Sequence, residues 1–382
     1  MRVAFYAPLK PPDHPVPSGD RRMARLLIQA LGLAGHEVEI AARLRSWNAR
    51  PDPARQARLE RIGQAMAERL LRRYRARPAA ARPRAWLTYH LYYKAPDWIG
   101  PRVAAGLGIP YLLAEASLAE KRANGPWARG HRATVAALER AAAVISLNPV
   151  DAECLPDPDR VRPIKPFLDA APFRAAAAQR REARTATAAA HGLDPARPWL
   201  LAVAMMRPGD KLASYRLLGD ALARLDGLGL DGLDWQLLVA GDGPARAEVE
   251  AAFDALAPDR VRFLGEMAPH DLPILAAACD LMVWPALNEA YGMALLEAQA
   301  AGLPVVAGHG GGVAAVVRDG ETGRLTAPGD ARAFAEAVRG LLEAPGTRRA
   351  MAEAAVAAVA AEHDLSAAAG RLDAVLRRAT GP

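Results

Sequence analysis

Short apolar runs that resemble strands alternate along the whole chain with longer stretches of helical periodicity. This alternation predicts parallel sheets covered by helices, because two parallel neighbours need a long crossover connection. Residues 21–36 show the pattern well: their apolar side chains recur three and four positions apart, which predicts a helix inside a strand–helix–strand unit. The expected strands are residues 2–9, 36–42, 85–91, 110–116 and 142–148 in the first half, and residues 199–206, 235–243, 261–266, 281–286, 303–310 and 323–328 in the second.

The chain has 382 residues, which suits two domains of this kind. Residues 163–198 consist mainly of proline, alanine, arginine and aspartate and contain no strand-like run. We therefore expect a first domain over residues 1–168, a linker over 169–198, a second domain over 199–360, and a C-terminal helix over 361–382 that packs back towards the first domain. Doubly wound sheets bind ligands at the carboxyl ends of their strands, so a cleft between the two domains is the expected site.

Composition excludes several classes of protein. The chain is 52% hydrophobic and 24% charged, as folded domains usually are. No apolar run approaches the ~20 residues that a membrane-spanning helix needs, and the apolar stretch at the start is too short for a signal peptide. The two cysteines, Cys154 and Cys279, form neither a disulfide framework nor a metal cluster. We expect a cytoplasmic protein.

Positive charge is concentrated in one region. The chain has a formal charge of +7, yet residues 43–84 alone hold thirteen arginines against three acids, so the remainder is slightly acidic. An anionic partner is therefore expected to bind there. Two interpretations stay open: a solvated helix packed on the first domain, or a surface that meets anionic membrane lipid. Nucleic acid is not expected, because few aromatic residues are interleaved with the arginines and there is no recognised binding module. The expected apolar side of this helix comprises Leu59, Ile62, Met66, Leu70 and Leu71.

Residues 284–306 carry the most informative motif. Glu289 lies just before a predicted helix and Glu297 lies inside it. Carboxylates accept hydrogen bonds from sugar hydroxyls, and the free N–H groups of a helix start attract phosphate. Two solvated glutamates near a helix start are the structural alternative. The N–H groups at this helix start belong to Tyr291, Gly292 and Met293.

This motif resembles that of the retaining family 4 glycosyltransferases, which have the GT-B fold. Their signature is a glutamate, seven residues and a second glutamate, with a tail of the form EAxAxGxPVV. Glu289 and Glu297 match the spacing, and Ala298, Ala300, Gly302, Pro304, Val305 and Val306 match the tail. The resemblance implies that Glu289 contacts the hydroxyls of a donor sugar and that Glu297 holds the ribose of its nucleotide.

Other segments of the second half also resemble this family. Residues 239–244 match its glycine turn, and residues 308–326 match its glycine pair followed by DGxTGxL, with Ala315 where the family usually has glutamate. The match over residues 261–286 implies that Glu266 and Met267 lie where the nucleobase is held.

Two cations, Arg207 and Lys211, follow the first predicted strand of the second domain. In the family an arginine and a lysine at this place grip the donor diphosphate, which gains negative charge as it leaves. The spacing here is one residue shorter than usual and the usual glycine before the arginine is absent. An ordinary charged surface loop is the alternative.

The first half resembles the family mainly in layout. Gly19 is the one candidate for the glycine that approaches the donor phosphates, where the family often has a glycine pair. Glu115 stands where many members carry a histidine, and either His90 or Glu115 is the candidate for positioning the acceptor. A histidine with a purely structural role is the alternative for His90. The candidates at the predicted strand end of residues 85–91 and just beyond it are Tyr89, His90 and Lys94.

The resemblance implies a GT-B fold, with two doubly wound Rossmann-like domains that face each other across a cleft. It implies a retaining, hexosyl-type glycosyltransferase of polysaccharide or glycolipid biosynthesis. Its partners would be a nucleotide-diphosphate sugar and a glycan, lipid or small-molecule acceptor, with no metal and no cofactor, at the inner face of a membrane or free in the cytoplasm. The alternatives are a nucleotide-sugar epimerase or phosphorylase on the same fold, or a non-catalytic nucleotide-sugar-binding module. A dehydrogenase is disfavoured, because no GxGxxG follows the first strand.

Overall fold

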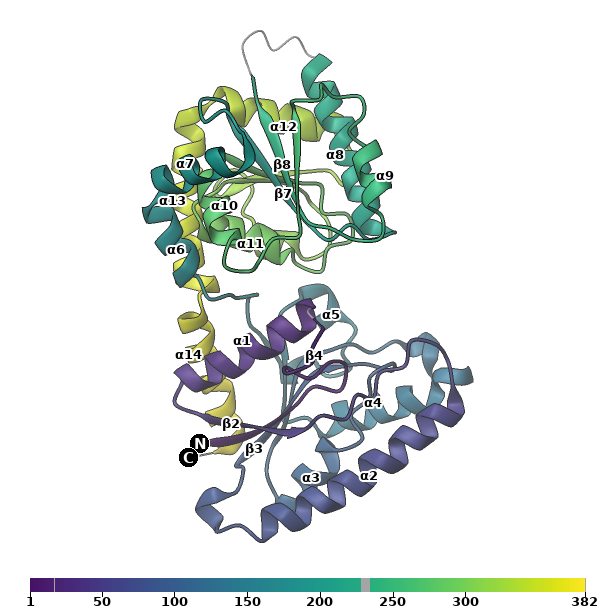
Figure 1. Cartoon of the computed structure of the whole chain (residues 1–382). Coiled ribbons are helices and arrows are strands. Elements are labelled where there is room, and N and C mark those ends of the chain that lie inside the picture. The colour runs from purple at the N-terminus through teal and green to yellow at the C-terminus, as the bar shows by residue number, and fades with distance from the viewer. Residues whose placement is uncertain (17, 228–233, 382) are drawn as a thin grey trace. The chain divides into compact units, whose positions relative to one another are not determined.

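The structure is a computed structural model that describes residues 1–16, 18–227 and 234–381 (Figure 1). Its contacts divide the chain into two compact units. The first unit comprises Met1–Lys165 together with Leu365–Pro382, and the second comprises Pro166–Asp364. The chain therefore leaves the first unit once and returns to it with its last helix.

The first unit is built on a six-stranded parallel sheet with the order β2-β1-β3-β4-β5-β6. The order reverses between β1 and β3, which makes this place the topological switch point of the sheet. Its strands are β1 (Arg2–Tyr6), β2 (Glu37–Ala42), β3 (Ala85–Leu91), β4 (Tyr111–Ala116), β5 (Ala143–Ser146) and β6 (Val161–Pro163).

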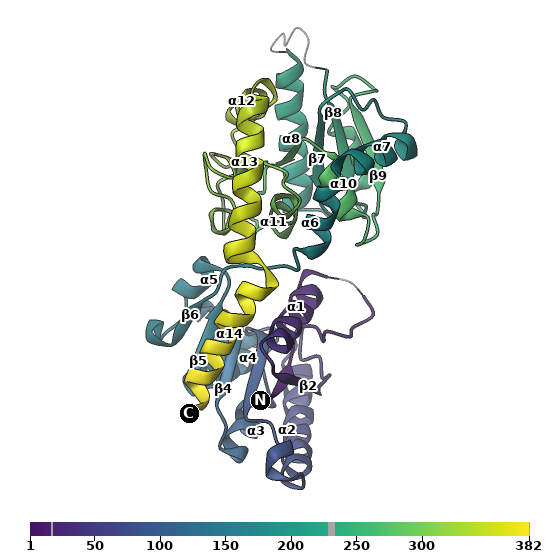
Figure 2. The ribbon, with the colours of Figure 1, turned by 90° about the vertical axis from the view of Figure 1, so that its left-hand side faces the viewer.

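Helices cover both faces of this sheet (Figure 2). The helix α1 (Gly19–Leu33) packs against α14 (Leu365–Thr380), the last helix of the chain. On the other face, α2 (Pro53–Arg75) packs against α3 (Gly100–Leu107) and α4 (Ala128–Arg140). The short helix α5 (Pro149–Glu153) follows β5. Two helix starts are capped as their sequences suggest: Ser18 Oγ accepts from Arg21 N, and Asp52 Oδ1 accepts from Arg55 N.

The second unit holds another six-stranded parallel sheet, with the order β12-β11-β10-β7-β8-β9. Its switch point lies between β7 and β10. The buried tryptophans Trp199, Trp235 and Trp284 belong to its core. The strands are β7 (Trp199–Val203), β8 (Gln236–Ala240), β9 (Val261–Gly265), β10 (Leu281–Trp284), β11 (Val305–Gly308) and β12 (Gly323–Thr326). The helices are α6 (Ala171–Ala178), α7 (Arg180–His191), α8 (Asp210–Gly227), α9 (Arg246–Ala251), α10 (Leu272–Ala278), α11 (Met293–Ala300), α12 (Ala331–Glu343) and α13 (Pro345–Ala358).

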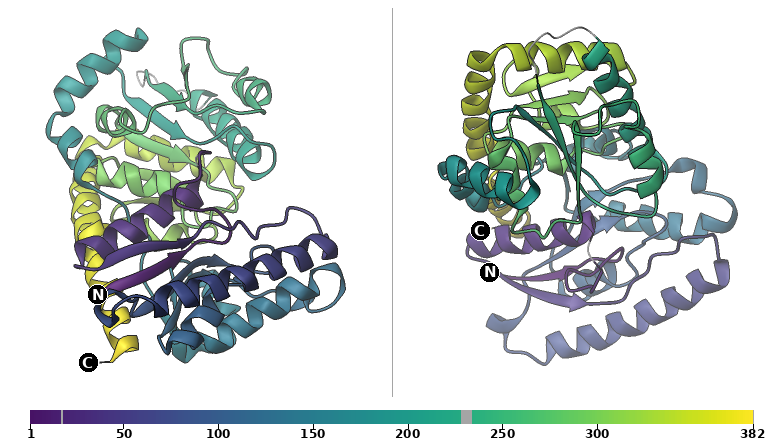
Figure 3. Two further views of the ribbon diagram at one scale, coloured as in Figure 1. Left: turned by 60° about the horizontal axis from the view of Figure 1, so that its bottom comes forward. Right: turned by 45° about the horizontal axis from the view of Figure 1, so that its top comes forward.

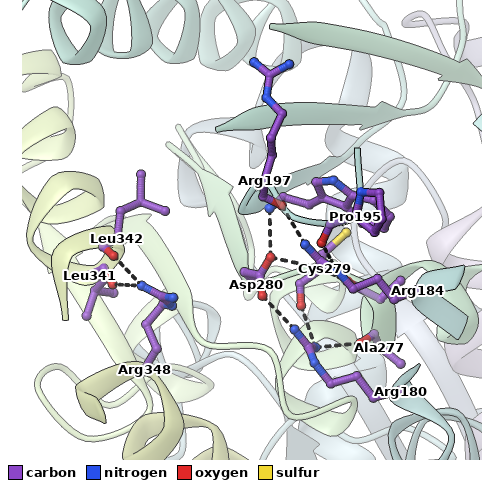
Figure 4. Close-up of polar contacts among 12 residues, drawn as sticks. Arg180, Arg184, Pro195, Arg197, Ala277, Cys279, Asp280, Leu341, Leu342 and Arg348 are labelled. Carbon is purple, nitrogen blue, oxygen red and sulfur yellow. Dashed lines mark hydrogen bonds and ion pairs between the residues drawn. The ribbon is translucent and has the colours of Figure 1, made fainter. Parts of the chain in front are cut away.

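The segment 169–198, expected to be a linker, holds two helices of the second unit. Its alanine-rich sequence forms α6 and α7, and both pack on α10. Two arginines of α7 anchor it (Figure 4). Arg180 donates to the carbonyls of Ala277 and Cys279 at 2.6 Å each, and Arg184 donates to Asp280 Oδ2 at 2.9 Å. The chain instead passes between the units at Lys165–Pro166 and at Asp364–Leu365.

The arginine-rich region forms the long helix α2, and one expectation about it was wrong. Leu59, Leu70 and Leu71 are buried, but Ile62, expected on the same apolar side, is 37% exposed. Its position on the helix turns it away from the neighbouring helices.

Among the residues that the structure describes, no helix combines the length and apolar character needed to cross a bilayer.

Candidate active site

An ion pair joins a helix start and a loop at the switch point of the second sheet. Lys211 lies in the first turn of α8, which follows β7, and Glu289 lies in the loop that follows β10. Lys211 Nζ pairs with Glu289 Oε1, and Trp284 Nε1 donates to the same oxygen at 3.4 Å. The ammonium also lies 5.4 Å from the centroid of the buried Trp284 ring. The glutamate is therefore held from one side by an indole and from another by a cation.

The loop that carries Glu289 is fixed to α8 by two further contacts. Asn288 Nδ2 donates to Asp210 Oδ1 at 2.9 Å, and Leu287 N donates to Ser214 Oγ at 3.1 Å. Ala286 and Asn288 both have left-handed backbone conformations, with φ of 55° and 52°. Such conformations are costly for residues other than glycine and persist where the surrounding contacts enforce them. The position of Glu289 is thus set by its loop as well as by its own side chain.

Glycine lets a second loop approach Glu289 closely. A Cβ atom at Gly311 would lie 2.0 Å from the carbonyl oxygen of Glu289, and Gly311 has a φ of 55°. The next residue, Gly312, donates its N–H to that carbonyl at 3.3 Å. Any side chain at position 311 would push the loop away from Glu289. The close approach to the Glu289 carbonyl therefore explains why this loop after β11 carries glycine at position 311.

The helix start expected to bind phosphate is present. Gly292 is the N-cap of α11 with a φ of 73°, and no side chain caps this helix start. Tyr291 and Met293 are half-buried and pack against the core of the second unit. Glu297 lies in the second turn of α11 and is only 6% exposed. The two signature glutamates thus differ in environment, because Glu289 is the more accessible of the two.

The remaining candidates of the second unit are more peripheral. Arg207 is exposed in the loop between β7 and α8, and no hydrogen bond of its guanidinium is seen within the described ranges. Glu266 is exposed just after β9, whereas Met267 is half-buried against the core. The end of β9 meets the glycine turn of residues 241–243, since Gly241 N donates to Gly265 O at 2.7 Å.

Three residues of this site were missed by the sequence analysis. Trp284 contacts both members of the Lys211–Glu289 pair. The loop that holds Glu289 is fixed by the hydrogen bond from Asn288 to Asp210. Trp284 and Asn288 stand within the stretch that carries the motif, and Asp210 directly precedes Lys211. Position beside a motif residue was the available signal, but it does not tell which side chain turns inward.

A second polar cluster lies at the switch point of the first sheet. His90 Nδ1 is 2.9 Å from Asp20 Oδ1, and Asp20 belongs to the first turn of α1. His90 and Glu115 lie opposite each other at the ends of β3 and β4, because the pairs on either side of them are in register. Both have left-handed backbones, with φ of 62° and 58°. Two such residues side by side mark a locally strained strand end.

Burial changes the acid–base properties of this cluster. It raises the pKa of the Glu115 carboxyl to about 7, although the N–H groups of Leu147 and Asn148 favour the ionised form. Burial by itself would also raise the pKa of Asp20, but the hydrogen bond and charge of His90 outweigh it, and the pKa of Asp20 is lowered. At neutral pH the cluster therefore combines an ionised acid, an imidazole and a carboxyl that is partly protonated.

The other candidates of the first unit do not join this pair as closely. Tyr89 is buried, with its ring centroid 5.7 Å from that of His90. Lys94 Nζ lies 5.8 Å from the ring centroids of Tyr93 and Trp127, which places it against those rings. Gly19 begins α1 and is exposed, and a Cβ atom added there would meet nothing within 4 Å. Its neighbour Asp20, which is not among the residues expected from the sequence, is the one that His90 contacts.

In the described part of the chain, no group of three or more His, Cys, Asp or Glu side chains is arranged to hold a metal ion.

Comparison with known proteins relates the second unit to a described protein family. Residues 210–357 match the family model described as glycosyl transferases group 1. A D-inositol 3-phosphate glycosyltransferase from Salinispora arenicola is 34% identical over 197 residues, which are 48% of this chain and 42% of the relative. A 2-deoxystreptamine glucosyltransferase from Streptomyces kanamyceticus is 37% identical over 109 residues, 28% of each chain. The chain thus spans less than half the length of these relatives.

Solved structures resemble the chain over its whole length. A glycosyltransferase from Rickettsia africae superposes with a TM-score of 0.74 at 16% identity, covering 99% of this chain and 98% of the other. Anabaena HepE, in complex with UDP-glucose, gives a TM-score of 0.67 at 19% identity, covering 99% and 100%. At such identities the likeness shows the fold, which is GT-B with two doubly wound units, as the sequence predicts. Residues 210–357 are thus similar to the family of glycosyl transferases group 1.

Proposed function

We propose that this chain is a retaining glycosyltransferase of family 4. It would move a hexosyl-type sugar from a nucleotide-diphosphate donor to the hydroxyl of a glycan, a lipid or a small molecule. The observation that carries the proposal is the Lys211–Glu289 ion pair at the switch point of the second sheet. A cation and a carboxylate held together there suit the two halves of a sugar diphosphate: one binds phosphate and the other binds hydroxyls.

In this proposal the cations act on the diphosphate. Lys211 is paired with Glu289, so donor binding would exchange one anionic partner of the ammonium for another. Arg207 is exposed in the β7–α8 loop, four residues before Lys211, and would bind the same diphosphate. Fixed positive charge stabilises the leaving nucleoside diphosphate as its negative charge grows. The two side chains would take the role that a metal ion has in other transferases, and no resident cofactor is involved.

The carboxylates and the helix start would orient the donor. Glu289 accepts hydrogen bonds from hydroxyls of the sugar, and Glu297 holds the ribose. The N–H groups of Tyr291, Gly292 and Met293 face the phosphates. Glu266 and Met267 lie beside the nucleobase in this arrangement. The partly buried state of Glu289 favours such bonds, since they strengthen where water is scarce.

The reaction step is a substitution at the anomeric carbon. The acceptor oxygen forms a bond to that carbon while the bond to the phosphate oxygen breaks. The electron pair leaves with the nucleoside diphosphate, and the acceptor proton passes to its phosphate oxygen. Attack and departure on the same face give retention. The first unit would supply the acceptor side, through His90, Glu115, Tyr89 and Lys94, with Gly19 towards the donor phosphates.

A panel of nucleotide sugars tests the proposal. The full chain is incubated with UDP-, GDP-, ADP- and dTDP-linked sugars, with and without a cell extract as the source of acceptor. Free nucleoside diphosphate that appears only with the extract supports transfer, and NMR of the product reports the anomeric configuration. An epimerised nucleotide sugar, or binding without turnover, would replace the proposal by one of the alternatives named from the sequence.

A further inference from the structure

The outer face of α2 carries a line of arginines that the proposed reaction does not use. At 100° per residue, the five positions fall within about a third of the helix circumference. All five side chains are exposed, and no acidic partner for them is seen among the residues that the structure describes. We call this set the arginine face; it consists of Arg55, Arg58, Arg61, Arg69 and Arg72.

The acids of α2 are engaged elsewhere. Glu60 pairs with Arg129 of α4, and Glu68 pairs with Arg102 of α3 at 2.6 Å. Both glutamates therefore point towards the neighbouring helices of the first unit. The consequence is a separation of charge on one helix: its acids are neutralised on the inner side, and the arginine face keeps its full positive charge.

A hollow next to this helix adds the guanidinium group of Arg132, for which no acidic partner is seen among the described residues, beside two arginines that already pair with the acids of α2. It has a volume of about 320 Å³ and lies between α2, α3 and α4. Three arginines line it, together with Glu60 and Asp97. Asp97 is buried and already accepts four hydrogen bonds, from Thr88, Tyr111 and two backbone N–H groups. A guanidinium group can donate two parallel hydrogen bonds to two oxygens of one phosphate. The three arginines are Arg102, Arg129 and Arg132.

We propose that the arginine face and this hollow dock the first unit onto a bilayer rich in anionic phosphodiester lipids. From Arg55 to Arg72 the helix extends about 26 Å at 1.5 Å per residue, and the ribbon of α2 is nearly straight (Figure 3), so the charges follow one side of a rod. A line of charge on a protruding helix fits a flat surface. Ile62, 37% exposed, lies between the arginines and supplies an apolar contact at the depth of the headgroups.

The chemistry of this face favours lipid over nucleic acid. Proteins that bind single strands stack bases on exposed aromatic rings. The one aromatic residue of α2, Tyr74, is fully buried, and Arg73 and Arg77 cover its ring at 5.0 and 4.9 Å. The arginine face therefore offers charge and a single aliphatic side chain. The hollow beside it adds one half-buried ring, Trp98, and a lone ring of this amphipathic kind suits a lipid headgroup region better than a row of stacked bases.

Vesicle sedimentation with the full chain tests the inference. We expect binding to phosphatidylcholine vesicles that contain about 30% phosphatidylglycerol, little binding to pure phosphatidylcholine, and a loss of binding as salt screens the charges. Replacing Arg58, Arg61, Arg69 and Arg72 by Gln should lower the partition coefficient about tenfold or more, since each basic residue near such a surface contributes favourably. Glutamine keeps helix propensity, so circular dichroism should be unchanged.

A matched control distinguishes binding through the arginine face from a general effect of the protein's net charge. Four exposed arginines of the second unit are replaced by Gln, which gives the same change in net charge; they are Arg181, Arg224, Arg262 and Arg349. Equal loss of binding in both variants would overturn the inference, as would unchanged binding of the α2 variant. Tighter binding to a single-stranded oligonucleotide than to the anionic vesicles would assign the face to nucleic acid instead. None of these measurements requires sugar transfer, so their outcome is independent of the proposed activity.

Discussion

Lys211 and Glu289 lie 78 positions apart in the chain, yet their side chains form an ion pair. Each follows one of the two strands, β7 and β10, between which the order of the second sheet reverses. At such a reversal the two connecting segments diverge to opposite sides of the sheet and leave room for a ligand. The pair thus lies where the topology favours ligand binding, and in the proposed reaction the donor diphosphate would take the place of Glu289 beside Lys211.

Glu289→Gln is the first test of this pair. The amide keeps the size of the side chain but removes the charge, so we expect the transfer rate to fall about 100-fold or more. Binding of the free nucleoside diphosphate should be unchanged or tighter, because Lys211 is released from its partner. Steady-state kinetics and calorimetry measure the two quantities. Glu248→Gln, on the exposed side of α9, is the control and should change neither. Normal turnover in Glu289→Gln would refute the role of this carboxylate.

Much of the fold was predictable because the strand runs are short and apolar and alternate with stretches of helical periodicity. All eleven expected strands are found in the structure. The twelfth, β6, spans only Val161–Pro163 at the edge of its sheet, and three residues give no detectable pattern. The segment 169–198 was misjudged because absence of strand signal was taken for a linker. Its alanines form α6 and α7, which Arg180 and Arg184 fasten to the end of α10.

The candidate site was predictable only where a motif marks it. Spacing singled out Glu289 and Glu297, and the position after the first predicted strand of the second domain singled out Lys211. The contacts of Trp284 and Asp210 depend on which strands are neighbours, and local sequence does not state the strand order. The left-handed backbones of His90 and Glu115 were equally hidden, because such conformations arise from tertiary contacts.

His90→Gln tests the acceptor side. The glutamine amide can donate or accept a hydrogen bond but lacks the imidazole that Asp20 holds at 2.9 Å. We expect the KM for the acceptor to rise about tenfold while donor binding stays the same, since a hydrogen bond to a charged group is lost. His270→Gln, whose imidazole is 82% exposed in the second unit, is the control. A rise in donor Kd of similar size would assign His90 to the donor instead.

Glu115 should make stability depend on pH. Its pKa is about 7 in the folded protein and near 4.5 when unfolded, so between these values the folded state binds the extra proton. Stability should therefore fall as pH rises from about 5 to 7, and then level off with respect to this group. Glu115→Gln stays neutral throughout and should flatten that part of the curve. Denaturant unfolding at several pH values measures the effect, and an equally steep fall in the variant would contradict it.

Chelation tests the proposal that cations of the protein replace a metal. Transfer should proceed at an unchanged rate after treatment with EDTA, whereas Lys211→Met should weaken binding of the nucleoside diphosphate by about tenfold or more. The ion pair with Glu289 makes Lys211 the best-positioned cation for this role. A rate that drops with EDTA and returns with added Mg²⁺ would show that the reaction uses a metal ion.

Asp280 holds the helix α7 against the second unit, and its loss should lower stability without a direct effect on the ion pair of Lys211. Its carboxylate accepts from Trp199 N at 2.8 Å, from Arg180 at 2.8 Å and from Arg184 at 2.9 Å. Asp280→Asn would leave two arginines facing an uncharged group, with an expected cost of about 2–4 kcal/mol in the free energy of unfolding. Asp254→Asn, exposed in the same unit, should cost less than about 0.5 kcal/mol. Denaturant melts of the two variants decide the matter, because an equal loss in both would mean that Asp280 is an ordinary surface acid.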